Sequence, residues 1–130
     1  MNLSKEQMRH ALNEYLRSIS SIADLEYQER VWINNQGPEC QAYDDAVCDF
    51  FDIGDPILDE YQNFGISKSQ YQILKQFRDQ FEAFADADDR PYLPEEFIDT
   101  PEWDEITKMA KEVLQAFHYG SDKSEGAAQP

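Results

Sequence analysis

Basic residues are scarce in this sequence, and cysteine, histidine and glycine are few. The 130 residues include 11 Lys and Arg against 27 Asp and Glu, so the formal net charge is −16; there are two Cys, two His and five Gly. Such a charge repels nucleic acid and anionic membranes and attracts cationic surfaces. Two His and two separated Cys also argue against a structural zinc site. The composition therefore favours a partner that is a basic protein.

Several functional motifs are missing as well. No apolar run approaches roughly 18 residues, and the N-terminus leads into a polar, capped helix rather than a secretory signal. There is no Gly-rich phosphate loop, GxSxG or HExxH. The run that begins at Asp86 and Asp88 resembles the start of a calcium-binding loop, but its fifth, sixth and twelfth positions hold Arg90, Pro91 and Phe97. We therefore expect a cytoplasmic protein that is not an enzyme and binds no cofactor or metal.

Cys40 and Cys48 lie eight residues apart in a segment predicted as one helix. At 1.5 Å per residue their Cα atoms would be about 12 Å apart, which is too far for a disulfide. Cys48 has no His nearby in the sequence, so we interpret it as a small, partly buried thiol rather than as a nucleophile. His10 and His118 are interpreted as structural or surface residues.

The strongest helical pattern spans residues 66–86. Ser67 and Gln70 fit a capping box, and Ile66 and Tyr71 fit the hydrophobic staple that accompanies it. Apolar residues then recur three or four positions apart, as expected for a buried face: Tyr71, Leu74, Phe77, Phe81 and Phe84, with Ile73 widening the stripe. The sequence therefore predicts a central, aromatic-rich helix at about 68–85.

The N-terminal half carries signals for three more helices. Ser4 opens a second capping box, which starts a helix of about 14 residues. Asp24 or Ser21 can cap a shorter helix after it, whose residues 30–33 could instead form a short strand. A third helix is predicted for residues 39–52, where Tyr, Ala, Val and Phe share one face.

Glycine and proline divide the rest of the chain. Gly54 is predicted to break the third helix, and Asp55 with Pro56 is predicted to cap and restart another. One helical turn is predicted for residues 94–97, and the last helix opens at Pro101. Together these elements predict an all-α fold.

The predicted fold is a single compact domain of five or six helices over residues 1–120. Its length and its aromatic content of 13% suffice for one core. Residues 121–130 are small and polar and lack large apolar side chains, so we predict a disordered tail there.

The acidic residues are unevenly distributed. Between Val31 and Ser67 there are eight acids and no base, and between Asp79 and Thr107 there are eleven acids and only Arg90. Acidity that served only solubility would not need such segregation. We interpret the acidic segments as a binding surface for a basic partner.

Two acidic patches with aromatic neighbours are the candidate interfaces, since interfaces favour aromatic anchors inside a polar rim. The first patch is Tyr43, Asp44, Asp45, Asp49, Asp52, Asp55, Asp59, Glu60 and Tyr61. The second is Asp86, Asp88, Asp89, Glu95 and Glu96. Tyr43, Tyr61, Tyr92 and Trp32 are expected to be partly exposed, whereas Phe50, Phe51 and Phe64 are expected in the core.

Five stretches carry a resemblance to a known family: Ala11–Ile19, Asp24–Ile33, Val47–Asp52, Gly54–Ile57 and Phe97–Trp103. They resemble bacterial contact-dependent growth inhibition immunity proteins, and the likeness covers most of residues 8–117. The resemblance implies a small cytoplasmic antidote that binds the C-terminal toxin domain of its own secreted effector, often a nuclease. It implies no particular binding residues, because such families diverge steeply to match their toxins.

The favoured function is therefore stoichiometric inhibition of a basic nuclease toxin. One alternative is a nucleic-acid mimic that inhibits a host DNA-binding protein; it predicts promiscuous binding that is lost at moderate salt. The other is an unrecognised enzyme or metal protein, which would need carboxylates facing inward across helices. No inward Asp or Glu is predicted on the helices whose faces can be assigned.

Overall fold

The computed structural model describes residues 4–36, 42–87 and 93–119, and this part of the chain contains helices and no strand. The predicted all-α single domain is confirmed. In chain order the elements are α1 (Lys5–Ala23), α2 (Leu25–Tyr27), the π-helix η1 (Gln28–Ile33), α3 (Tyr43–Asp59), the 3₁₀-helix η2 (Tyr61–Phe64), α4 (Lys68–Asp86), α5 (Pro94–Phe97) and α6 (Pro101–Ala116). The predicted tail, Cys40, Tyr92, Asp88, Asp89 and Gly120 lie outside the described residues.

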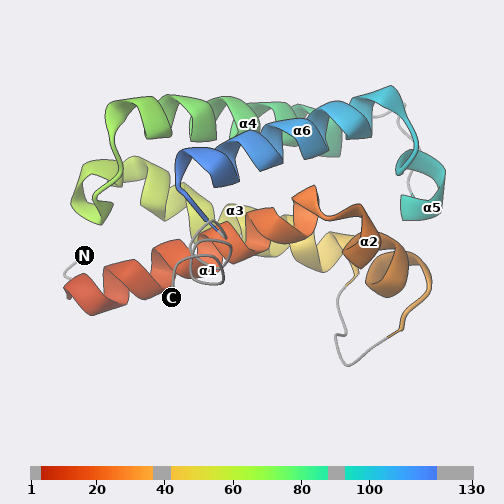
Figure 1. Cartoon of the computed structure of the whole chain (residues 1–130), viewed down its shortest axis with the longest axis horizontal. Helices are drawn as coiled ribbons and strands as arrows, with labels where there is room; N and C mark the ends of the chain where they lie inside the picture. The colour runs from red at the N-terminus through yellow and green to blue at the C-terminus, as the bar shows by residue number, and fades with distance from the viewer. Residues whose placement is uncertain (1–3, 37–41, 88–92, 120–130) are drawn as a thin grey trace, which may run out of the picture.

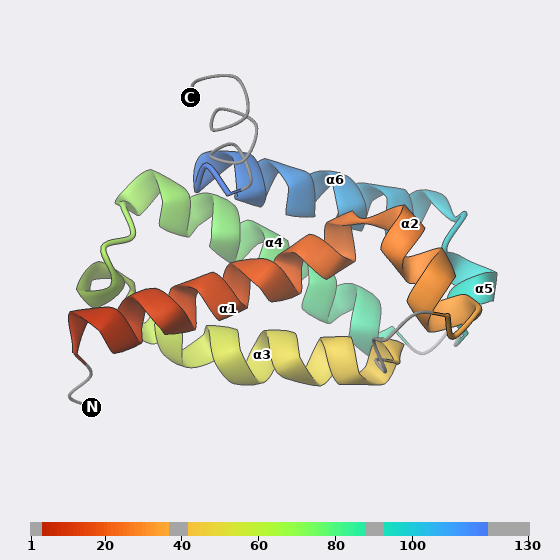
Figure 2. The same cartoon turned by 60° about the horizontal axis from the view of Figure 1, so that its bottom comes forward.

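The four long helices form two layers (Figure 1). Helices α4 and α6 pack against each other in one layer, and α1 and α3 pack against each other in the other. Helix α1 also contacts α6, which joins the layers. The short elements α2, η1 and α5 close one end of the bundle, as both views show (Figures 1 and 2).

Most of the predicted helix starts are confirmed. The hydroxyls of Ser4 and Ser67 accept hydrogen bonds from backbone N–H groups three residues on, each at 3.1 Å, and a glutamine side chain returns the bond in both capping boxes. Asp24 caps α2 at 3.0 Å, and Thr100 caps α6 at 3.2 Å. Side-chain caps of this kind depend only on neighbouring residues, which is why sequence identifies them.

Three boundaries differ from prediction. Helix α1 continues to Ala23, several residues beyond the predicted end. Residues 30–33, left open between helix and strand, form the end of the π-helix η1. Helix α3 begins at Tyr43 rather than at residue 39, because Ala42 has extended backbone angles.

Helix α3 runs through the position where the sequence predicts a break. Gly54, Asp55 and Pro56 all lie inside it, so the predicted break and restart are wrong. A proline inside a helix removes one backbone bond and costs about 3 kcal/mol. The helix continues because residues on both sides of the proline, including Phe50 and Ile57, are buried in the same core, and each large buried apolar side chain contributes roughly 1.5–3 kcal/mol.

The core is a cluster of aromatic rings. Helix α4 contributes Phe77, Phe81 and Phe84 to it, so the predicted stripe is confirmed, although Ile73 is 37% exposed and does not widen it. Trp103 of α6 is fully buried. Its ring centroid lies within 6.2 Å of five others, those of Trp32, Tyr43, Phe81, Phe84 and Phe97.

Tyr15 of α1 is fully buried beside α3, and its hydroxyl has no hydrogen-bond partner in the described part of the chain. Burial raises the pKa of this phenol far above its ordinary value, and the negative charge of Asp55 raises it further, while Arg78 opposes the shift. The hydroxyl therefore stays neutral in the folded state at every ordinary pH.

Replacing Tyr15 with Phe is expected to make the fold less sensitive to alkali. Because the folded-state pKa is raised, the contribution of Tyr15 to stability is fully present below about pH 10 and is lost above it, at up to about 1.4 kcal/mol per pH unit. Urea unfolding at about pH 8 should give similar free energies for both proteins, and at about pH 11 the variant should be more stable by about 1 kcal/mol. Equal alkaline losses in the two proteins would contradict this assignment.

Candidate binding surface

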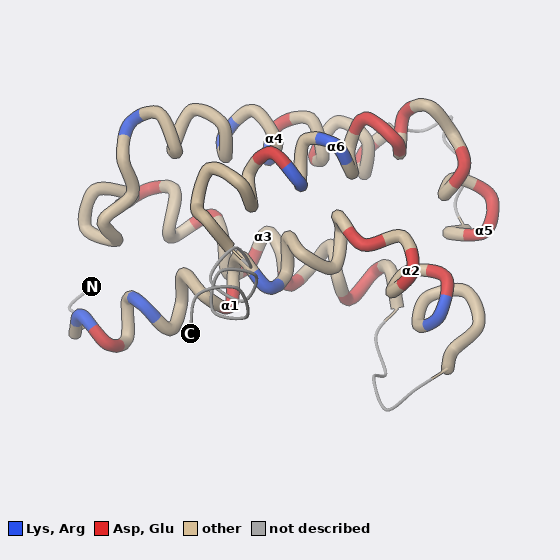
Figure 3. Tube along the Cα trace, viewed as in Figure 1, with Lys and Arg blue, Asp and Glu red and all other residues tan. Residues whose placement is uncertain are grey.

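The outer face of α3 is acidic along its length. Helix α3 holds six Asp residues and no Lys or Arg. Five of the six are exposed: Asp44, Asp45, Asp49, Asp52 and Asp59. In Figure 3 red segments recur along this helix, whereas the blue segments lie mainly on α1, α4 and α6. The sequence prediction of an exposed acidic face on this segment is therefore consistent with the structure.

The first candidate patch extends over the whole length of α3. Its N-terminal members, Asp44 and Asp45, lie at the end closed by α2 and α5, and its C-terminal members, Asp59 and Glu60, lie at the opposite end of α3. A 17-residue helix is about 24 Å long from first to last residue. A partner that contacts both ends of α3 would have to lie along the whole helix.

Of the two tyrosines in the first patch, Tyr43 is less accessible than predicted and Tyr61 is partly exposed as predicted. Tyr43 is only 5% exposed, because its ring packs at 4.9 Å from Phe97 and 5.5 Å from Trp32. Tyr43 is therefore part of the core and not an anchor. Tyr61 is partly exposed and stacks on Tyr71 with centroids 4.1 Å apart, which leaves it as a possible contact residue.

Cys48 is exposed on the acidic face of α3, which corrects the predicted partial burial. It lies between Asp44 and Asp52 along the helix, on the outward side opposite the buried Ala46 and Phe50. Helical spacing alone does not distinguish a face that is only partly covered by neighbours from one that is open. The thiol gives a chemical probe in the middle of the acidic face.

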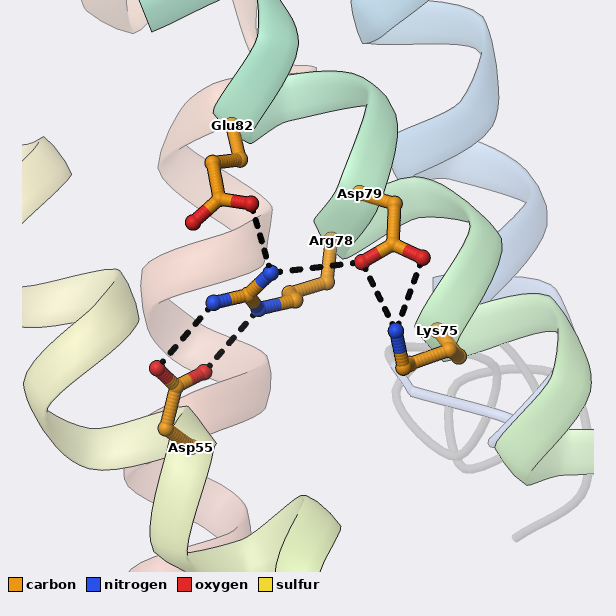
Figure 4. A network of polar contacts seen from close by, with 5 residues as sticks. All are labelled: Asp55, Lys75, Arg78, Asp79 and Glu82. Atoms are coloured by element: carbon orange, nitrogen blue, oxygen red, sulfur yellow. Dashed lines mark hydrogen bonds and ion pairs between the residues drawn. The ribbon is translucent and has the colours of Figure 1, made fainter. Parts of the chain in front are cut away.

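Asp55 is engaged in an ion-pair network, which the sequence did not predict (Figure 4). The guanidinium of Arg78 on α4 donates to both carboxylate oxygens of Asp55, at 3.1 and 3.2 Å, and also to Glu82 at 2.9 Å and Asp79 at 3.2 Å. Lys75 donates to Asp79 at 2.8 and 2.9 Å. Asp55 therefore joins α3 to α4 and is neither a helix cap nor a free interface residue.

The charges of this network support one another. The hydrogen bond to Asp55 is the largest influence that raises the pKa of Arg78, and the bond from Lys75 is the largest that lowers the pKa of Asp79. Asp79 is half exposed, so solvent screens its pairs and their contribution to stability is small. The bidentate contact mainly fixes the position of α3 on α4.

Ten exposed carboxylates gather at the end of the bundle that α2, η1 and α5 close (Figure 3). We call this surface the acidic end; its members are Glu26, Glu29, Asp44, Asp45, Asp86, Glu95, Glu96, Asp99, Glu102 and Asp104. Among the Lys and Arg residues that the structure describes, only Arg30 belongs to α2, η1, α5 or the first turns of α3 and α6. The acidic end thus contains two members of the first patch, Asp44 and Asp45, and the three described members of the second, which are Asp86, Glu95 and Glu96.

The acids collect there partly because helix N-termini collect there. Helices α3, α5 and α6 all begin at this end, and acidic residues in a first turn suit the positive end of the helix dipole. Asp45 accepts a hydrogen bond from the Ala42 N–H at 3.1 Å, and Glu96 accepts one from the Leu93 N–H at 3.3 Å. These two carboxylates therefore support local structure as well as surface charge.

Gln28 holds the acidic end together and was not singled out from the sequence. Its side chain is fully buried; the amide NH₂ donates to the carbonyls of Ser21 and Ile22 at 2.9 and 2.8 Å, and its oxygen accepts from the Trp103 indole at 2.9 Å. Gln28 precedes the apolar Val31 by three positions, so the two residues share one helix face. This spacing is the sequence signal that could have indicated a buried glutamine. The contacts fix η1 against α1 and α6.

The structure shows little that would hold a small ligand. No three His, Cys, Asp or Glu side chains lie close enough together for a metal ion within residues 4–36, 42–87 and 93–119. A groove of about 440 Å³ between α1 and α3 is lined mainly by polar and charged side chains, among them Glu14, Arg17 and Asp49. Small-molecule sites are mostly apolar, so this groove does not resemble one. None of the described helices is long and apolar enough to cross a membrane.

Comparison with known proteins gives no match, since no family model fits the sequence and neither a curated protein nor a solved structure is significantly similar to it. The function therefore has to be inferred from the chain's own residues. Their most distinctive arrangement is the scarcity of bases on α3 and at the acidic end, where Arg30 is the one described base, whereas the other described bases lie on α1, α4 and α6.

Proposed function

We propose that this protein is a non-enzymatic cytoplasmic inhibitor that binds a basic toxin domain in one-to-one stoichiometry, as the immunity protein of a contact-dependent growth inhibition system does. The observation that carries the proposal is the concentration of exposed carboxylates on α3 and at the acidic end, where Arg30 is the one base among the described residues. A surface of this kind competes with nucleic acid for the Lys and Arg of a nuclease groove and accelerates association with it.

Two further observations support an inhibitor over a catalyst. The exposed carboxylates of α3 and of the acidic end are on the surface rather than in a water-excluded cleft, and general acid–base catalysis needs groups whose surroundings adjust their pKa. The family resemblance in five stretches between residues 8 and 117 points to the same role. The proposed toxin is a nuclease, because an enzyme that acts on nucleic acid requires a basic groove to bind the phosphate backbone.

The proposal is tested by titrating the nuclease activity of the toxin domain from the adjoining reading frame with this protein. We expect activity to fall linearly and to end at about one equivalent, since tight binding consumes the inhibitor stoichiometrically. Polyglutamate at the same charge concentration is the control, and it should inhibit weakly and lose its effect as salt rises. Full activity at a tenfold molar excess of the protein would refute the proposal.

A nucleic-acid mimic is the second candidate, favoured by the regular recurrence of exposed acids along α3. Asp45, Asp49 and Asp52 lie about one helical turn apart, so their spacing along the axis is about 4.5–6 Å. A DNA strand carries one charge per roughly 3.4 Å. The α3 row is sparser than the backbone it would imitate, so this function ranks second. It predicts binding to several unrelated basic proteins instead of one.

A further inference from the structure

We infer that the contact surface for the partner is the acidic end, and that its occupant is a protein surface on which Lys and Arg surround an apolar centre. The inference rests on the proposed function and deepens it, because it says which of the acidic surfaces meets the basic toxin. In the complex, the middle and the far end of α3 would remain exposed to solvent.

Apolar side chains are exposed within the acidic end, and this observation is independent of the charge. Leu25, the first residue of α2, is 40% exposed, and Leu93, which directly precedes α5, is 47% exposed. Trp32 on η1 is partly exposed and packs on Tyr27, with ring centroids 6.3 Å apart. Interfaces bind through apolar and aromatic anchors inside a polar rim, and the acidic end has both parts. The middle of α3 presents Asp residues, Cys48 and Pro56, and none of its large apolar side chains is as exposed as Leu25 or Leu93.

The acidic end is also held in a fixed shape. Gln28 ties η1 to the last turn of α1 and to Trp103, and Trp103 in turn packs on Phe97 of α5 at 4.9 Å. A surface that is ordered before binding loses less conformational entropy when the partner docks. Segments of π-helix such as η1 are frequent at functional sites, which agrees with this placement.

Charge complementarity identifies the occupant. Ten exposed carboxylates share the acidic end with Leu25, Leu93 and Trp32, and Arg30 is the one described base in α2, η1, α5 and the first turns of α3 and α6. The Arg30 guanidinium already lies 5.8 Å from the centre of the Tyr27 ring, and it donates to the Gln36 carbonyl at 3.3 Å. Only a partner with an excess of Lys and Arg can cover this surface without leaving many carboxylates unpaired.

Two triple charge reversals test the inference against its nearest competitor. The first variant is Glu29→Lys, Asp86→Lys and Asp99→Lys in the acidic end, and the second is Asp49→Lys, Asp52→Lys and Asp59→Lys on α3. Each variant changes the net charge equally, and none of the six side chains makes a hydrogen bond within the described residues. Asp86 ends α4, where Lys is also favourable to the helix dipole.

The probe is the catalytically inactive toxin domain from the adjoining reading frame, and the readout is its dissociation constant and association rate. The acidic-end variant should bind about a hundredfold more weakly, mainly through slower association, and the α3 variant should change by about threefold or less. Weakened binding by the α3 variant alone would overturn the inference and leave the proposed function standing. Absence of binding by the unaltered protein would overturn the proposed function, and the inference with it.

A second pair of variants tests the apolar centre without changing charge. Leu93→Ser should weaken binding by about tenfold, whereas Ile73→Ser, a matched change at an exposed position on α4, should leave it unaltered. Thermal unfolding of both variants checks that the fold is retained. Equal affinities for the two variants would contradict an apolar contact at the acidic end.

Discussion

Replacing Trp103 with Ala is expected to lower the free energy of unfolding by about 3–5 kcal/mol. The side chain is fully buried, its ring touches five other rings, and its indole N–H donates to Gln28. Truncation would open a cavity between the two layers and would leave the buried Gln28 oxygen without its donor. Single domains are stable by about 5–15 kcal/mol, so the loss is a large part of the total.

Thermal or urea unfolding measures this effect, and Trp32→Ala is the matched control. Trp32 belongs to the same cluster but is partly exposed, so its truncation should cost about 1–2 kcal/mol. The two variants should also separate stability from function. Trp32→Ala should keep the fold and weaken toxin binding, since Trp32 is an anchor of the acidic end. A Trp103→Ala protein as stable as Trp32→Ala would contradict the burial of Trp103 in the aromatic cluster.

Replacing Gly54 with Ala is expected to destabilise the protein by about 2–3 kcal/mol, the upper part of the range for overpacking. A Cβ atom at Gly54 would fall 2.6 Å from the Tyr15 hydroxyl oxygen and closer still to two carbons of the same ring. Tyr15 cannot move aside, because it is fully buried and packs on Phe50 with centroids 5.3 Å apart. In an open helix the same change would be stabilising by up to about 1 kcal/mol.

Urea unfolding of Gly54→Ala is compared with that of Cys48→Ala, an exposed position on the same helix. The control should differ from the unaltered protein by about 0.5 kcal/mol or less. Combining Gly54→Ala with Tyr15→Leu should recover part of the loss relative to Tyr15→Leu alone, because the smaller side chain makes room for the new methyl group. A Gly54→Ala protein of unchanged or increased stability would contradict the close approach of α1 and α3.

Local signals in this sequence were sufficient for the fold class. The capping boxes at Ser4 and Ser67, the Thr100 cap and the stripe of Leu74, Phe77 and Phe81 all depend on residues within one or two helical turns. Their geometry follows from backbone bonding and helical periodicity, so no knowledge of the rest of the chain is needed.

Where prediction failed, a distant segment decided the outcome. The local sequence around Pro56 is typical of a helix start. Helix α3 nevertheless continues through it, because the side chains of Phe50 and Ile57 are buried in the core. Asp55 was predicted to cap a helix, but it forms an ion pair with Arg78, which lies 23 positions later in the chain. Tyr43 was expected to be partly exposed, because acidic residues follow it. It is instead buried, because its ring packs against Phe97.

The candidate surface was predictable in composition but not in shape. Counting acids along the chain identifies both charged segments, because charge is a property of residues and not of their arrangement. Neither the separation of Asp44 from Asp59 by the length of α3 nor the contact between η1 and α5 can be inferred from sequence spacing. They follow from how α3, α5 and η1 dock on the aromatic cluster.

The most direct test of the proposed function is the mass of the complex with the toxin domain from the adjoining reading frame, measured at about 0.15 M and about 0.5 M salt. Salt at the higher concentration screens exposed charges to within a few ångströms, so only an interface with packed apolar contacts persists. We expect a one-to-one complex at both concentrations. A dedicated inhibitor would be contradicted if no complex formed at about 0.15 M, or if several basic proteins bound and dissociated at about 0.5 M. The acidic surface would then serve solubility or mimicry of nucleic acid.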